Sequence, residues 1–131
     1  MIARRRLIFA AVILLAACKS SPTGPVAGTL KVILTTPNSG FDGAVMLTLS
    51  APAVPSSVTP TAGLALWGAP VASTTAKLVL TGTLSTGTIL TLQVDDVGKV
   101  GQYSVQLVDV AAAGTFQLRR PLTLYSAAVT K

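Results

Sequence analysis

The chain contains no histidine and no glutamate, and Cys18 is its only cysteine. These absences exclude a Ser-His-Asp or Cys-His nucleophile system, a zinc site built from histidine or cysteine, and acid–base catalysis by a glutamate pair. With one cysteine, no disulfide can form within the chain. We therefore expect no enzymatic activity and no cofactor, and we expect packing alone to hold the fold together.

Charged and aromatic residues are also scarce, at 11% and 5% of the sequence. The core must therefore be aliphatic, and serine and threonine must supply most of the surface polarity, which suits strands better than helices. The formal net charge is +6, but three of the ten cations are the arginines at residues 4–6. The other cations are scattered apart from Arg119-Arg120, with no basic stripe interleaved with aromatic residues, so we expect no nucleic-acid binding.

The N-terminal segment explains the single cysteine. After the three arginines, residues 7–17 form an apolar run that ends at Cys18. A membrane-spanning helix needs about 20 apolar residues, so this shorter run predicts the hydrophobic part of a signal peptide over residues 1–17. The tetrapeptide Leu15-Ala16-Ala17-Cys18 resembles the lipobox of bacterial lipoproteins, in which a leucine and two small residues precede an invariant cysteine.

This resemblance implies cleavage between Ala17 and Cys18, a diacylglycerol on the Cys18 thiol and an N-acyl chain on the new terminus. Two or more acyl chains attach a protein durably to a membrane, so the expected location is the bacterial cell envelope. An aspartate after the cysteine retains lipoproteins at the inner membrane, so Lys19 favours the outer membrane in a cell that has two. The alternatives are a free thiol in an uncleaved signal anchor or in an ordinary signal peptide cut nearby.

The mature chain is predicted to consist of a tether and one domain. Residues 18–28 follow the cleavage site and are rich in serine, proline and glycine, which predicts a flexible tether. From residue 29 to residue 131, short apolar runs alternate with polar residues at a period of two and are separated by turn residues. This pattern predicts an all-β domain, an antiparallel two-sheet sandwich of about eight strands.

The expected strands are 29–36, 44–52, 63–70, 76–82, 87–94, 101–110, 115–120 and 122–130. The first two are predicted to form a hairpin through the turn residues 37–43. Prolines between residues 52 and 60 predict a non-helical crossing loop.

Two local patterns refine the fold class. The segment VGQYSV at residues 100–105 resembles the tyrosine corner of immunoglobulin-like sandwiches, although Val105 stands where antibody domains have a cysteine. The segments 28–52 and 87–110 resemble the opening hairpin and a later strand pair of cohesin and related bacterial modules. Together they imply an immunoglobulin- or cohesin-like sandwich. The whole chain also resembles small envelope lipoproteins of environmental bacteria, a likeness that implies no mechanism.

The four aspartates are the only candidates for acid chemistry. Asp95-Asp96 is interpreted as a strand end followed by a turn, with Lys99 as a solvated counter-charge. Asp42, Asp95 and Asp96 are weak calcium candidates, because Ca²⁺ accepts oxygen ligands from flexible loops. A catalytic pair is disfavoured, because adjacent residues on a strand point to opposite faces of the sheet.

The remaining candidates are aromatic or basic. Trp67 and Tyr125 could contact a ligand by stacking on a sugar ring, but a lone tryptophan in a sandwich is more often a core or rim residue, and we favour that position for Trp67. Arg119-Arg120, which precedes Pro121, is interpreted as a charged device against edge-to-edge strand pairing. The alternative is contact with an acidic lipid or polymer.

These observations predict a membrane-anchored lipoprotein with a non-catalytic binding or structural role in the cell envelope, with a protein as its partner. The alternative is a polysaccharide-binding module displayed on the same surface. An exposed Trp67 beside a second aromatic residue would favour the polysaccharide, whereas a buried Trp67 would favour a structural scaffold.

The substitution Cys18→Ser tests the anchor, because it removes the sulfur atom to which the lipid would be attached. We expect the variant to be released from membranes or to stall before cleavage, as measured by membrane fractionation and intact-mass spectrometry. A variant that fractionated with membranes and was trimmed like the wild type would contradict lipidation at Cys18.

Overall fold

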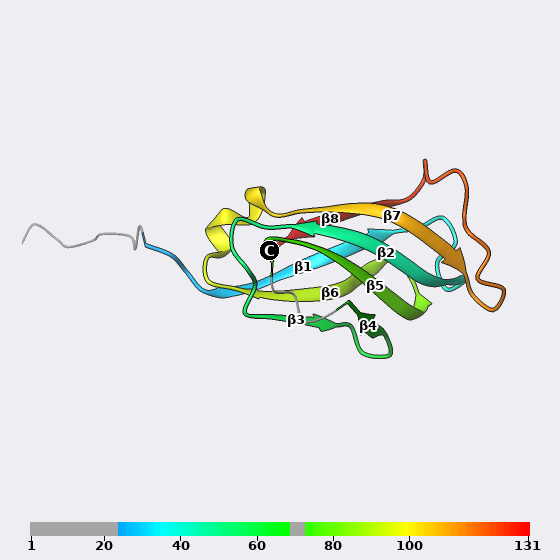
Figure 1. The fold of residues 1–131 in the computed structure, drawn as a ribbon, viewed down its shortest axis with the longest axis horizontal. Coiled ribbons are helices and arrows are strands. Elements are labelled where there is room, and N and C mark those ends of the chain that lie inside the picture. The colour runs from blue at the N-terminus through cyan, green and yellow to red at the C-terminus, as the bar shows by residue number, and fades with distance from the viewer. Residues whose placement is uncertain (1–23, 69–72) are drawn as a thin grey trace, which may run out of the picture.

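The computed structural model describes residues 24–68 and 73–131. Within these residues, two antiparallel sheets of four strands pack face to face (Figure 1), which confirms the predicted all-β sandwich. No helix in this part of the chain is long and apolar enough to cross a bilayer. Ala17 and Cys18, the expected cleavage and lipidation residues, lie outside the described residues.

The eight strands of the described residues are β1 (Gly28–Thr35), β2 (Asp42–Ser50), β3 (Ser57–Pro60), β4 (Ala65–Trp67), β5 (Thr75–Leu84), β6 (Gly87–Val94), β7 (Ser104–Ala112) and β8 (Ser126–Thr130). One sheet has the order β3-β6-β1-β8 and the other the order β4-β5-β2-β7. A short 3-10 helix, η1 (Val97–Gln102), connects β6 to β7.

The core is aliphatic and follows the predicted alternation. Along β1, Leu30, Val32 and Leu34 are fully buried, while Lys31 and Thr35 between and after them are exposed. Strands β2, β5 and β6 contribute in the same way to one cluster whose members include Val45, Leu47, Leu49, Leu78, Leu80, Leu90, Leu92 and Val94. Burial of these side chains, each stabilising by about 1.5–3 kcal/mol, replaces the missing disulfide as the link between the sheets.

Three predictions about individual strands are wrong. β1 and β2 do not form a hairpin, because they belong to different sheets. Residues 57–60, expected in a crossing loop, form the edge strand β3, where Pro60 is tolerated as the last residue. Residues 115–120 form no strand but only one isolated bridge, between Leu118 and Ala111, because the positive φ of Phe116 turns the chain away from extended pairing.

The two ends of the sandwich differ in what they carry. At the end where β1 begins, the backbone N–H of Val97 in η1 donates to the carbonyl of Val26. The opposite end, which we call the distal end, consists of the β1–β2 loop (residues 36–41) and the β7–β8 connection (residues 113–125) (Figure 1). A ligand bound at the distal end would therefore meet the side of the domain opposite the start of β1.

Gly43 allows the two distal segments to approach each other. It is buried in β2 at a shift in register, and a Cβ atom at this position would lie 2.8 Å from the Cα atom of Ala113. The neighbouring backbone N–H of Ala113 donates to the carbonyl of Phe41 at 2.8 Å. The β7–β8 connection thus packs directly on the backbone of β2.

Gly43→Ala is expected to force these backbones apart and to lower the free energy of unfolding by about 1–3 kcal/mol, the usual cost of overpacking. Equilibrium denaturation measures the loss. Gly101→Ala is the matched control, because a Cβ at Gly101 would meet nothing within 4 Å. Equal effects of the two substitutions would contradict this packing.

Candidate functional site

A buried carboxylate organises the distal end. Asp42 is the first residue of β2 and is 0% exposed, which makes it one of two buried polar residues among those described, with Thr36. An ionised carboxylate in an apolar interior is tolerated only when it is paired and hydrogen-bonded. The contacts of Asp42 therefore identify the groups that fix this end of the molecule.

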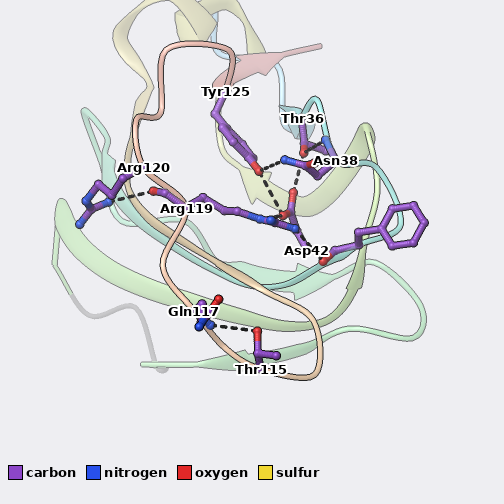
Figure 2. A network of polar contacts seen from close by, with 9 residues as sticks. Thr36, Asn38, Asp42, Thr115, Gln117, Arg119, Arg120 and Tyr125 are labelled. Atoms are coloured by element: carbon purple, nitrogen blue, oxygen red, sulfur yellow. Dashed lines mark hydrogen bonds and ion pairs between the residues drawn. The ribbon is translucent and has the colours of Figure 1, made fainter.

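Three side chains donate to the Asp42 carboxylate (Figure 2). The Thr36 hydroxyl donates to Oδ2, whereas Arg119 Nε and the Tyr125 hydroxyl each donate to Oδ1 at 3.1 Å. These donors come from the β1–β2 loop and from the β7–β8 connection, so the carboxylate joins two segments that are far apart in the sequence. Arg119 also supplies the compensating charge.

A second set of hydrogen bonds surrounds this carboxylate. Asn38 Nδ2 donates to the Tyr125 hydroxyl at 2.8 Å, and the backbone N–H of Asn38 donates to Thr36 Oγ1 at 2.9 Å. Arg119 Nη2 donates to the carbonyl of Phe41 at 3.3 Å. Each hydroxyl thus both donates and accepts, which fixes the side-chain orientations on both segments.

Arg120 plays a different role from its neighbour. Its Nη2 pairs with the Asp109 carboxylate on β7, and Figure 2 shows its side chain directed away from Asp42. The Arg120 and Asp109 side chains are 57% and 30% exposed, so solvent weakens this pair. Of two consecutive arginines, one thus compensates a buried charge and the other lies at the surface.

A hollow of about 280 Å³ opens beside this network. Its polar lining comes from side chains of the network and its neighbours, and two prolines and a leucine provide the apolar part. The lining residues are Pro37, Asn38, Arg119, Arg120, Pro121, Thr123, Leu124 and Tyr125. The buried network forms one side of the hollow, so its shape is held by hydrogen bonds rather than by loops alone.

Exposed apolar side chains occur on the same two segments. Phe41 is 71% exposed, Phe116 61% and Leu124 72%. The backbones of the two phenylalanines are close, because Phe41 accepts from Ala113 and Phe116 donates to the carbonyl of Ala112. Aromatic and arginine side chains are both enriched in protein-binding surfaces.

The predicted aromatic candidates are separated. Tyr125 lines the hollow, but Trp67 lies on the edge strand β4, 59% exposed rather than in the core, with its Nε1 donating to Thr81 Oγ1 at 2.9 Å. Trp67 pairs with Val79 on β5, whereas Asp42, next to Phe41, pairs with Leu84. Five residues of strand separate these pairs, roughly 16 Å, so the backbones of Trp67 and Phe41 are not adjacent.

The calcium candidates are not brought together either. Asp95 and Asp96 follow β6 at the end where β1 begins, while Asp42 lies at the distal end and is paired with Arg119. Asp96 caps η1, accepting from the backbone N–H of Gly98 at 2.9 Å, in agreement with the turn interpretation. No group of three potential metal ligands occurs in the two described ranges.

Tyr103, the residue of the predicted tyrosine corner, lies in the core and is 6% exposed. Its burial, with smaller contributions from the carboxylates of Asp95 and Asp96, raises the pKa of its phenol. The hydroxyl therefore stays protonated, as a core residue requires.

The sequence did not identify Thr36 and Asn38 as site residues, and it singled out Arg119 only together with Arg120, not as the partner of Asp42. The available signal was weak: an aspartate at the start of an apolar strand. No family model, curated protein or solved structure matches this chain.

Arg119→Met is expected to leave the Asp42 carboxylate buried and uncompensated, and so to lower the free energy of unfolding by about 3 kcal/mol or more. Arg120→Met is the matched control, because it removes only a surface pair worth about 1 kcal/mol or less. Urea denaturation measures both. Equal losses would show that the Arg119–Asp42 pair does not hold this end of the domain.

Proposed function

We propose that this chain is a lipid-anchored lipoprotein of the bacterial cell envelope whose sandwich binds a partner protein through its distal end, without catalysis. The lipobox-like sequence at Cys18 and the tether at residues 18–28 support the anchor. The surface at the distal end supports the binding role. The anchor holds the domain at the membrane, and the distal end is the surface that binds the partner.

The observation that carries the binding role is the exposure of Phe41, Phe116 and Leu124 on the two distal segments, together with a hollow on the same segments that Leu124 and two arginines line. Covering such exposed apolar side chains with a partner is favourable, because it removes their apolar surface from water. Aromatic and arginine side chains also contribute most of the binding free energy in protein interfaces. A rigid hydrogen-bonded base lowers the entropic cost of binding, since little of this surface must be ordered.

A polysaccharide is the second candidate, and Trp67 is the observation in its favour. Its indole is 59% exposed, and the hydrogen bond to Thr81 holds the ring on a regular strand. A flat, oriented aromatic face of this kind can stack on a sugar ring. The polysaccharide is ranked second because the backbones of the exposed phenylalanines lie at the distal end and not beside Trp67.

The double substitution Phe41→Ser, Phe116→Ser tests the protein partner. In cross-linked native membranes, we expect it to reduce the cross-linked partner by about tenfold or more, because interface aromatic residues commonly contribute about 2 kcal/mol each. Trp67→Ser is the matched control, since it also removes one exposed aromatic side chain. Quantitative mass spectrometry of the cross-linked species gives the measurement.

The reverse pattern would contradict a distal protein interface. If Trp67→Ser alone abolished retention on insoluble envelope polysaccharide, and the double variant behaved like the wild type in both measurements, the polysaccharide-binding function would be supported instead.

A further inference from the structure

Only one edge of the Arg119 guanidinium group donates hydrogen bonds to the described residues. A guanidinium has a side edge, formed by Nε and the adjacent Nη2 hydrogen, and an end edge, formed by Nη1 and the second Nη2 hydrogen. The side edge is occupied, because Nε donates to Asp42 and Nη2 donates to the carbonyl of Phe41. The end edge has no hydrogen-bond partner within residues 24–68 and 73–131.

The environment of this free edge favours an anion. Arg119 lines the hollow, and its side chain is 30% exposed, so this side chain is accessible to solvent but partly desolvated. No carboxylate lines the hollow: Asp42 is fully buried behind Arg119, and Asp109 pairs with Arg120. Two parallel N–H donors in a fixed plane match the two oxygens of a carboxylate, which gives a bidentate ion pair.

The position of Arg119 is already fixed before a ligand arrives. Asp42 cannot move without exposing a buried charge, and Thr36 and Tyr125 hold the same carboxylate from two other directions. An arginine that is held in this way loses little side-chain entropy on binding. The buried network therefore acts as the support of a preformed carboxylate site.

The rest of the hollow indicates what carries the carboxylate. Asn38 and Thr123 provide polar groups beside Arg119, while Pro37, Pro121 and Leu124 provide apolar walls. A volume of about 280 Å³ lies just below the range of pockets for drug-sized ligands, so it suits the end of a chain. A terminal carboxylate next to an aliphatic side chain matches these walls better than the hydroxylated ring of an acidic sugar.

We propose that the distal hollow binds the C-terminal carboxylate of an extended peptide segment of the partner protein, through the end edge of Arg119. The aliphatic side chain of that terminal residue packs against Pro37, Pro121 and Leu124. This inference rests on the proposed protein-binding function and specifies the chemistry of the partner. It adds a charge-specific contact to a surface that would otherwise bind through apolar area.

The test uses the full chain purified in detergent and the probe N-acetyl-glycyl-alanyl-leucine, either as the free acid or as the C-terminal amide. Backbone amide chemical shifts are followed by NMR during titration with each probe. We expect the acid to cause saturable shifts at residues 36–38 and 119–125, and we expect the amide to bind about tenfold more weakly, because it lacks the charge. Equal affinities for acid and amide, or no saturable shift at these residues, would overturn the proposal.

A charge placed on the lining separates binding from folding. Thr123→Asp puts a carboxylate into the hollow without removing any member of the Asp42 network, so the acid probe should bind at least about tenfold more weakly through like-charge repulsion. Thr130→Asp is the matched control, since Thr130 is exposed on β8 away from the hollow. Equal weakening by the two variants would also overturn the proposal.

A third probe tests the other source of carboxylates. A trimer of galacturonic acid that shifts the same amides, with no response to the peptide acid, would replace the peptide by an acidic polysaccharide and overturn the inference. Loss of the partner in the Phe41→Ser, Phe116→Ser variant is independent of these titrations. The proposed function and this inference can therefore fail separately.

Discussion

The buried carboxylate of Asp42 is the constraint on which the distal end depends. It sits where β2 begins, at 0% exposure, and it is stable there only because Thr36, Arg119 and Tyr125 donate to it together. A hydrophobic pair at this position could join the same segments, but it would not fix their orientation so narrowly. Hydrogen bonds require defined distances and angles. The position of the Arg119 guanidinium and the side of the hollow that it forms follow from this single requirement.

The sandwich itself could be predicted because it depends on alternation. Runs such as residues 29–36 and 87–94 place aliphatic side chains on one face, and this pattern fixes which residues enter the core regardless of which strands pair. Strand pairing could not be predicted in the same way. The segment 37–43 has turn chemistry that suits a hairpin, yet β1 pairs with β6 and β8 while β2 pairs with β5 and β7. Local turn residues indicate that the chain bends, but they do not indicate which sheet the next strand joins.

The site was less predictable than the fold. Asp42 was grouped with Asp95 and Asp96 because carboxylates are the usual ligands of calcium, but its partner is an arginine 77 residues away. Nothing local distinguishes Arg119 from Arg120, and only the three-dimensional structure shows that one faces a buried charge and the other the surface. The position of Trp67 could not be predicted from its residue type either. Its identity favoured the core, but its place on an edge strand exposes it.

The pairing of β1 with β8 has a consequence for the order of folding. β1, close to the start of the domain, occupies an inner position of its sheet, and one of its two neighbours is the last strand of the chain. Among consecutive strands of the described residues, only β4 and β5 pair with each other, so most contacts close long loops and the domain should fold slowly. The first sheet cannot be completed until β8 is available to pair with β1. Until that strand arrives, one edge of β1 has no partner within its sheet.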